Sequence, residues 1–320
     1  MAQVVYREHH ELIAGGRGLT VRGLPSFSPY TMDGYTMDAR STLRGWLISP
    51  ASFIALCICV AMAAVLQYSL RTFIPGSLDV GGLTLTNFSG LGKQIYLDAF
   101  TNTLRLSVET TVCSLLVAYP LAYALVRVRN RYIKSFILIV SITPLFLGEI
   151  VRTYSWIIVL GSTGFINSML LKLGMIDTPL TLMFSHLGVL VALVHVTVPV
   201  VVLMLATAIS HIDRDYEKAA ESLGAGPVRT FLTITLPLSM PGILASITTS
   251  FAWTFSAFAT PQMIGGGRVP TVSTLVYQLG FSSMNFPLAA SLSVMGLGLT
   301  AISLMLLGRV TRRLKAIGGH

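Results

Sequence analysis

Three long stretches of the chain contain no charged side chain. Residues 178–212, 230–267 and 269–308 lack Asp, Glu, Lys and Arg. A helix crosses the hydrocarbon core of a membrane in about 20 apolar residues. Each stretch is therefore long enough for one spanning helix with flanking structure, and the pattern predicts a membrane protein with several spans.

Six segments have the length and apolar character of spanning helices. They are residues 49–70, 102–126, 134–154, 184–210, 240–263 and 288–309. Residues 153–171 are also uncharged, but Gly161, Gly164 and Asn167 interrupt them, and the letters GSTGFIN are typical of a turn. We therefore assign this stretch to the connection after the third span.

The basic residues predict the topology of these six spans. Sixteen of the 22 Lys and Arg residues lie in the N-terminal tail, the second and fourth connections and the C-terminal end. Cytoplasmic segments carry an excess of Lys and Arg, so both termini are expected in the cytoplasm. A seventh span would put one basic terminus outside. The expected fold is an all-α, polytopic helical bundle of the inner membrane with six transmembrane helices.

The connections on the outer side cover residues 71–101, 155–183 and 264–287. They are long and contain apolar residues, so we expect short helices along the membrane interface there. The membrane domain is expected over 46–310. A polar cytoplasmic tail without regular elements is expected at 1–45, and a basic cytoplasmic tail at 311–320.

The composition agrees with a membrane protein and excludes other classes. Of the 320 residues, 53% are hydrophobic and 11% are charged, whereas soluble domains have roughly 25% charged residues. This excludes a water-soluble enzyme and intrinsic disorder. The net charge of +9 follows from the topology and needs no nucleic acid partner. The sequence contains no phosphate-binding loop, metal-ligand spacing or nucleophile–base pair, so we expect no catalysis and no cofactor in this chain.

The connection between the fourth and fifth spans, residues 211–243, is the most informative part of the sequence. Asp213 or Asp215 can cap a short helix over 216–223 by accepting backbone N–H bonds. Gly224 follows where a left-handed residue would end that helix. We call residues 211–243 the 211–243 loop.

This loop resembles the EAA loop of binding-protein-dependent ABC importers. That motif reads Glu-Ala-Ala, three residues, Gly, nine residues, then Ile-x-Leu-Pro. The matching positions here are Ala219, Ala220, Gly224, Ile234, Leu236 and Pro237. One position departs from the motif, because Lys218 stands where the family has its acid and Glu217 lies one residue earlier.

The resemblance implies a cytoplasmic coupling helix that seats in a groove of an ATPase, with Tyr216, Glu217 and Lys218 added to the motif residues as coupling residues. It also implies the partners. These are a homologous second permease subunit, two cytoplasmic ABC ATPase subunits that bind ATP and Mg, and a periplasmic or lipid-anchored substrate-binding protein.

Four segments resemble the spermidine/putrescine-type permeases of this family. They are residues 101–123, 151–167, 173–184 and 258–267. The resemblance implies transport of a polyamine or a related organic cation. The family also imports opines, phosphonates, ferric ion and thiamine, and these solutes stay open as alternatives. So does an ion-driven secondary transporter, although such a carrier would show inverted repeats.

A polycation needs carboxylates or aromatic faces along its path. The acidic candidates are Glu109, which can instead pair with Arg105 four residues earlier, and Glu149, near Arg152. Packing is the alternative for the aromatic candidates, and a hydrogen bond to a neighbouring helix is expected for His195. The aromatic candidates are Tyr154, Trp156, Trp253, Phe255 and Phe258.

Overall fold

The structure is a computed structural model that describes residues 32–76 and 79–318. The chain divides into two compact units, Met1–Ala61 and Met62–His320. The described part of the first unit is the N-terminal portion of helix α2 (Met32–Ser69). All other described elements belong to the second unit.

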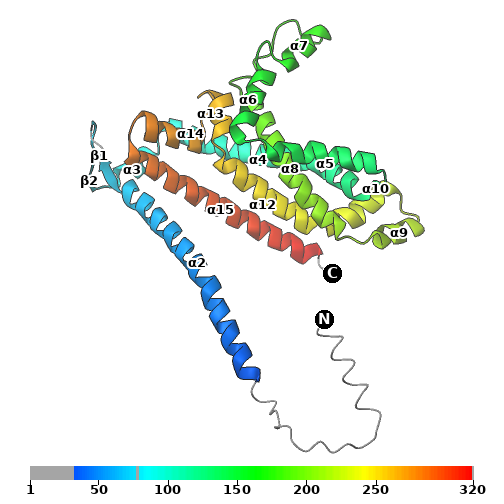
Figure 1. The fold of residues 1–320 in the computed structure, drawn as a ribbon. Helices are drawn as coiled ribbons and strands as arrows, with labels where there is room; N and C mark the ends of the chain where they lie inside the picture. Colours follow the sequence, from blue (N-terminus) through cyan, green and yellow to red (C-terminus); the bar gives the residue numbers. More distant parts are fainter. Residues whose placement is uncertain (1–31, 77–78, 319–320) are drawn as a thin grey trace, which may run out of the picture. The chain divides into compact units, whose positions relative to one another are not determined.

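The second unit is almost entirely helical (Figure 1). Strands β1 (Arg71–Phe73) and β2 (Val80–Leu83) form an antiparallel hairpin. The helices are α3 (Thr86–Gly90), α4 (Gln94–Arg127), α5 (Arg131–Phe146), α6 (Glu149–Leu160), α7 (Phe165–Lys172), α8 (His186–Ser210), α9 (Arg214–Ser222), α10 (Pro227–Thr230), α11 (Leu236–Leu238), α12 (Met240–Ser256), α13 (Ala259–Gly265), α14 (Val272–Tyr277) and α15 (Phe286–Gly318), with π-helices η2 (Phe231–Thr235) and η3 (Gln278–Ser282).

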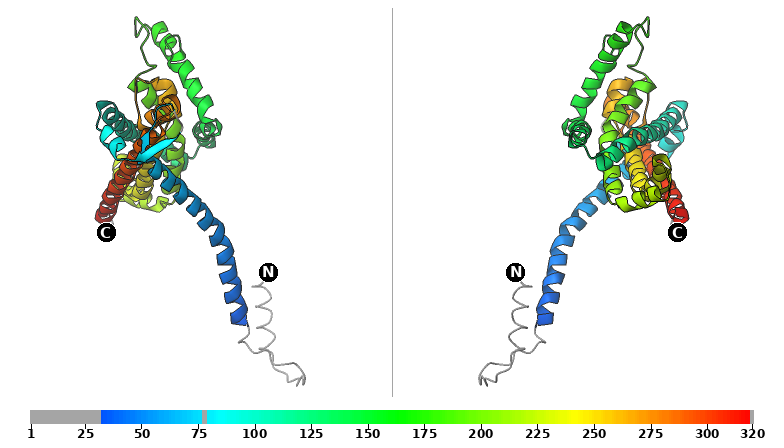
Figure 2. Two further views of the ribbon diagram at one scale, coloured as in Figure 1. Left: turned by 90° about the vertical axis from the view of Figure 1, so that its left-hand side faces the viewer. Right: turned by 90° about the vertical axis from the view of Figure 1, so that its right-hand side faces the viewer.

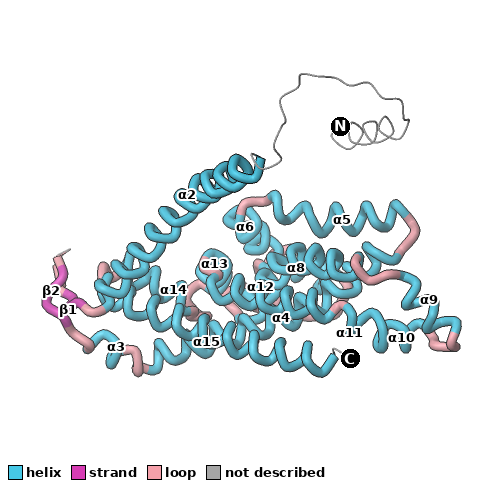
Figure 3. The backbone as a smooth tube through the Cα atoms, turned by 90° about the horizontal axis from the view of Figure 1, so that it is seen from below, coloured by secondary structure: helices cyan, strands magenta, loops and turns pink. Residues whose placement is uncertain are grey.

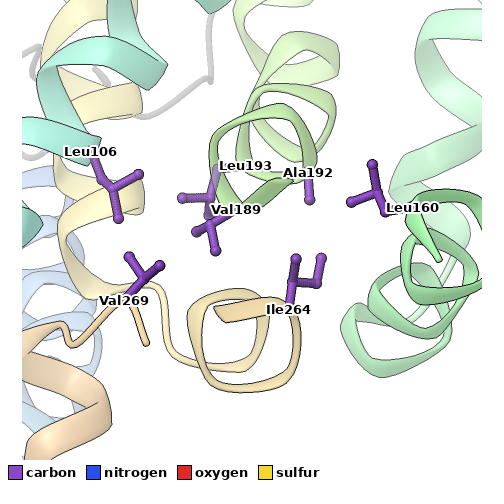
Figure 4. Packing of buried hydrophobic residues seen from close by; sticks show 7 residues of the cluster. All are labelled: Leu106, Leu160, Val189, Ala192, Leu193, Ile264 and Val269. Carbon is purple, nitrogen blue, oxygen red and sulfur yellow. The ribbon is translucent and has the colours of Figure 1, made fainter. Parts of the chain in front are cut away.

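Helices α4, α8 and α12 pack against one another and form the centre of the unit. The residues of α8 itself are apolar on nearly all sides of the helix, which is typical of a buried helix. In one core cluster Val189, Ala192 and Leu193 of α8 lie among Leu106 of α4, Leu160 of α6, Ile264 of α13 and Val269 (Figure 4). The central helices therefore hold the flanking helices α6 and α13 in place.

Small residues let α4 and α12 approach α8 closely. Ala118 and Ala122 of α4 are fully buried against Val202 and Leu205 of α8. On α12, a Cβ added to Gly242 would overlap the Cβ of Ala208 on α8. Close packing of this kind is how helices associate inside membranes.

Five helical segments among the described residues are long and apolar enough to cross a membrane. They are Pro50–Ser69, Gln94–Arg127, Glu149–Lys172, His186–Ser210 and Phe286–Arg309. A sixth arises if Pro227–Leu238 and Met240–Ser256, which meet at 65°, count as one span. The prediction of a helical protein with several spans is confirmed.

The predicted third span, 134–154, is wrong as a continuous helix. Helix α5 ends at Phe146, Leu147 is extended, and α6 begins at Glu149. Pro144 lies in the last turn of α5 and removes a backbone donor, and Gly148 follows. The chain then stays helical to Leu160 and turns where expected, at residues 161–164, before α7.

The predicted fifth span, 240–263, is also broken. Helix α12 ends at Ser256 because Ala257 adopts an extended conformation, and α13 starts at Ala259. The side chain of Ser273 donates a hydrogen bond to the Ala257 carbonyl at 2.6 Å. This bond supplies a partner for a carbonyl that leaves the helix.

The connections and tails differ in part from expectation. The first outer connection contains the hairpin of β1 and β2, which was not expected, and the short helix α3. Helices α7, α14 and η3 are the short helices expected in the other two outer connections. Helix α2 begins at Met32, inside the segment for which no regular element was expected, and α15 continues to Gly318. Residues 1–31 and 319–320 of the predicted tails lie outside the described residues.

Two groups of elements lie at opposite ends of the second unit. The β1–β2 hairpin and α3 lie at one end, and α9 and α10 lie at the other, beside the connection from α4 to α5 (Figure 3). Helix α7 projects beyond the central helices when the unit is viewed from either side (Figure 2). The 211–243 loop and the end of α4 are therefore neighbours.

Candidate functional site

Helix α9 is the short helix expected in the 211–243 loop, although it begins two residues early, at Arg214. The Asp213 carboxylate caps it by accepting a hydrogen bond from the Asp215 backbone N–H at 3.0 Å. After its end Gly224 has φ +86°, in the left-handed region that glycine adopts without strain. The capped short helix is confirmed, with Asp213 as the cap.

One face of α9 is apolar and exposed. Tyr216 and Ala219 are three residues apart on α9, and Leu223, which directly follows its last residue, is four further on, so the three lie on the same side. Leu223 is 90% exposed and Tyr216 is 59% exposed. Val228 and Leu232, just beyond α9, are exposed as well. We call Tyr216, Ala219 and Leu223 the exposed face of α9, and a patch of this kind is typical of an interaction surface.

The opposite face of α9 carries a buried ion pair. Glu217 Oε1 lies 3.0 Å from Nη2 of Arg127, the last residue of α4, and the two side chains are only 13% and 9% exposed. The Thr235 hydroxyl donates to the same oxygen at 2.8 Å. Arg127 also donates to the Ile212 carbonyl at 3.0 Å. Two side chains from separate elements, Arg127 of α4 and Thr235 of η2, thus hold Glu217 of α9.

A second arginine joins the same two elements from the other side. Arg214 Nη2 donates to the carbonyls of Val126 and Arg127 at 3.1 and 3.0 Å. Carbonyls at the C-terminus of a helix lack partners within the helix, and the helix dipole favours a cation there. The end of α4 and the start of α9 are therefore bonded in both directions.

Tyr119, Tyr123 and Arg127 follow one another at four-residue spacing on α4, and we call them the α4 stripe. The Tyr119 hydroxyl lies 2.7 Å from that of Ser239. The Phe231 ring meets both tyrosine rings edge to face, with ring centres 5.5 and 5.6 Å apart. All three residues of the stripe contact the 211–243 loop.

The remaining residues of the EAA-like motif do not contribute to the buried ion pair or to the exposed face of α9. Lys218 is exposed and pairs with Asp215 at 2.7 Å on the surface, and Ala220 is half-buried. Ile234 lies in η2, and Leu236 and Pro237 form the first turn of α11. The second half of the motif is thus a broken helical segment that leads into α12.

Glu109 has two partners within the chain. Its carboxylate is 2.7 Å from Arg105 Nε and 2.5 Å from His186 Nε2 at the start of α8. The pairing with Arg105 that the sequence offered as an alternative is confirmed. His186 is an additional partner, which the sequence did not indicate.

The candidates on α6 have different environments. Glu149 is exposed at the first position of the helix and, within the described part of the chain, forms no ion pair with Arg152. Arg152 is buried and donates to the Pro144 carbonyl at 2.9 Å. Tyr154 is 56% exposed. Trp156 donates its indole N–H to His195 Nδ1 at 3.1 Å, which confirms the hydrogen bond expected for His195.

The aromatic candidates near the end of α12 also differ from one another in burial. Trp253 is 53% exposed, whereas Phe255 is buried and packs on Phe251 with ring centres 6.0 Å apart. Phe258 lies in the break before α13, with its ring 4.9 Å from that of Tyr277. Packing, the alternative to a path role, is what the structure shows for Phe255.

The structure brings residues of the 211–243 loop into contact with α4, but it does not bring the candidates for the solute path together. Among the described residues, no hydrogen bond or ring contact links one path candidate to another, and no group of three His, Cys, Asp or Glu could hold a metal. The sequence did not single out Arg127, Tyr119, Tyr123 or Thr235. The four-residue spacing of the two tyrosines and the arginine is a signal that could have identified them.

Comparison with known proteins identifies the class. The sequence pattern of the family described as binding-protein-dependent transport system inner membrane component matches residues 111–316, and the chain belongs to this family. It is a multi-pass inner-membrane permease of an ABC importer, a type of subunit that is not itself catalytic.

Two curated relatives are permeases of named transport systems. The chain is 26% identical over 273 residues to the spermidine/putrescine transport system permease protein PotB of Escherichia coli (strain K12), which covers 85% of this chain and 96% of the relative. It is 32% identical over 219 residues to the molybdenum transport system permease protein ModB of Haemophilus influenzae (strain ATCC 51907 / DSM 11121 / KW20 / Rd), with coverage of 66% and 93%.

A solved structure supports the fold. A chain in the crystal structure of a bacterial alginate ABC transporter, in complex with alginate pentasaccharide-bound periplasmic protein, superposes with a TM-score of 0.72 at 17% identity. The match covers 88% of this chain and 97% of that chain. At this identity the likeness shows the fold alone.

Proposed function

We propose that this chain forms half of the translocation path of an importer for spermidine, putrescine or a related organic cation. The support is the similarity to PotB, which extends over most of both chains. The other half would come from a homologous permease subunit, and a periplasmic or lipid-anchored binding protein would deliver the solute. The binding protein would then set most of the selectivity.

The exposed face of α9 carries the coupling part of this proposal. In our proposal α9 seats in a groove of a cytoplasmic ABC ATPase, with Tyr216, Ala219 and Leu223 in contact and Lys218 at the rim. Two such ATPase subunits would bind ATP and Mg and hydrolyse ATP. Closure of the ATPase pair would move α9 and rock the spans between inward-open and outward-open states.

The proposed topology has six crossings and two cytoplasmic termini. Helices α2, α4, α8 and α15 would each cross once, and the bent pair Pro227–Leu238 and Met240–Ser256 would supply the fifth crossing. Helices α5, α6 and α7 would together supply the third. This arrangement puts α9 on the same side as the termini, which agrees with the distribution of basic residues.

The exposed candidates are the ones we propose for the solute path. Glu149, Tyr154 and Trp253 have side chains that the chain itself leaves uncovered, so they are available to a cation that passes between two permeases. Glu109 and Trp156 are hydrogen-bonded within the chain, Phe255 is buried, and the Phe258 ring contacts that of Tyr277. These four are more readily explained by packing.

The second candidate function is import of a solute other than a polyamine. It is favoured by the similarity to ModB, which is higher in identity than that to PotB. Membership of the binding-protein-dependent family argues against an ion-driven carrier.

The deciding experiment is a thermal-shift screen of the binding protein that works with this chain. We expect spermidine or putrescine to raise its melting temperature. A shift with molybdate, ferric ion or a phosphonate, and none with polyamines, would overturn the polyamine proposal while leaving the permease class intact. ATPase binding is tested separately, by co-purification with the tagged chain before and after deletion of residues 216–223.

A further inference from the structure

We propose that the α4 stripe transmits the movement of α9 to the membrane domain, with the Arg127–Glu217 ion pair as the joint. This rests on the proposed docking of α9 on an ATPase. It goes further by naming the helix that receives the movement and the residues that hold it. Arg127 and Glu217 are positioning residues in this scheme, because they act through the helices that they connect.

Helix α4 needs such a joint because the chain does not connect it directly to the loop. Helices α8 and α12 are continuous with the 211–243 loop at its two ends, so a displacement of α9 reaches them through the backbone. Helix α4 lies about 90 residues earlier in the sequence, and it meets the loop through an ion pair and hydrogen bonds instead of a direct chain connection. It also packs against both α8 and α12. Unless it moved with the loop, the shared core would have to repack.

The Arg127–Glu217 ion pair opposes a displacement of α9 along α4. Glu217 Oε1 binds Arg127 and Thr235, and the two charged side chains are 13% and 9% exposed. A shift of one helical turn, about 5.4 Å, would leave both charges unpaired in a poorly solvated site. An unpaired buried charge is far more costly than a displaced apolar contact. Arg214 adds two bonds in the opposite direction.

The aromatic part of the stripe fixes the orientation. The Phe231 ring meets the rings of Tyr119 and Tyr123 nearly at right angles, and the Tyr119 hydroxyl is hydrogen-bonded to Ser239, which precedes α12. Contacts at three successive turns of α4 therefore engage α9, η2 and the start of α12. Because α4 contacts the loop at several points, a rotation of the loop would move α4 as well as a translation would.

The departure from the family motif fits this role. The family's acid position holds Lys218, which is exposed, and the acid of this chain is Glu217, which points toward α4. The carboxylate is thus occupied inside the permease. Its removal should uncouple transport from ATP hydrolysis without removing the surface on which the ATPase docks.

The test uses the whole complex, purified through a tag on this chain and reconstituted in proteoliposomes, with uptake and ATP hydrolysis measured on the same sample. We expect Arg127→Gln and Glu217→Gln each to lower the solute transported per ATP by about tenfold, within the usual range of coupling between distant sites. The ATPase should still co-purify. The exchanged pair, R127E with E217R, should restore more than half of the lost ratio, and Thr235→Val should lower the ratio by roughly two- to threefold, as expected for one hydrogen bond.

The matched control is Arg129→Gln, because Arg129 is exposed and lies two residues beyond Arg127. It should leave the ratio unchanged. An unchanged ratio in both single variants would overturn the proposal, and so would loss of the ATPase from them, since the pair would then shape the dock. If the Arg127→Gln and Glu217→Gln proteins do not accumulate in cells, the Thr235→Val protein provides the test. An unchanged ratio of solute transported per ATP in that protein overturns the proposal. Failure of the unmodified chain to retain any ATPase would instead overturn the proposed docking.

Discussion

The two regions that we propose for coupling and for the solute path differ in whether their polar groups have partners within the chain. At the 211–243 loop, Glu217, Arg127 and Arg214 are all bonded within the chain. Along the proposed solute path, Glu149 and Trp253 are exposed. A subunit that supplies half of a path must leave its ligand-facing groups open, because their partners arrive with the solute or the second subunit. The groups that pass force must be paired in advance.

The largest expected effect comes from a charge on the exposed face of α9. Leu223→Asp should weaken ATPase retention by about 2 kcal/mol, or roughly thirtyfold in affinity, as for an interface hot spot. Stability of the chain should not change, because Leu223 is 90% exposed. Co-purification of the ATPase measures the effect. Leu83→Asp on β2, which is 75% exposed at the other end of the unit, is the control, and equal retention in the two variants would refute the docking face.

The next effect concerns the place where the loop enters the core. Gly242→Val would bring a side chain into Ala208 of α8 and should lower the free energy of unfolding by about 1.5 kcal/mol, as overpacking does. A melting curve of the purified chain measures it. Gly298→Val on α15 is the control, because a Cβ there meets nothing within 4 Å. Equal melting temperatures would show that α8 and α12 separate easily at this point.

A smaller effect is expected on the solute path. Glu149→Gln should raise the KM for polyamine uptake by about two- to fivefold, the usual range for an exposed ion pair, with ATPase retention unchanged. Uptake into proteoliposomes measures it. Asp177→Asn, an exposed acid in the connection after α7, is the control. A KM that moves equally in both variants would indicate a general surface-charge effect.

The smallest effect is expected at Glu109. Glu109→Gln should lower the free energy of unfolding by about 0.5 kcal/mol, because the ion pairs with Arg105 and His186 are partly exposed. The KM for uptake should not change. A raised KM with unaltered melting would return Glu109 to the solute path and weaken the contrast between paired and open groups.

The sequence predicted those parts of the structure that depend on local chemistry. Helix α9, its Asp213 cap and its Gly224 end follow from residues within a dozen positions of one another. The breaks before Glu149 and after Ser256 were missed, because hydropathy averages over a whole span and is insensitive to one residue. Pro144 and Gly148 carried the signal for the first break.

The joint between Arg127 and Glu217 could not be predicted in the same way. The two residues are 90 positions apart, and their contact depends on how α4 packs against α8. No periodicity along the chain encodes that distance. Only the stripe on α4 was visible in the sequence, without any indication of what it faces.

Helix α4 is long for the membrane that it is proposed to cross. Its 34 residues correspond to about 51 Å, whereas the hydrocarbon core is about 30 Å thick. About 27 Å of axis separates Glu109 from Arg127, and Pro120, the proline inside this helix, lies between the two tyrosines of the stripe. A lever of this length magnifies small angles, because a tilt of about 10° over 51 Å moves the far end by about 9 Å. In the proposed mechanism, the displacement that an ATPase can transmit therefore depends on the length of α4 and on how stiff it remains at Pro120.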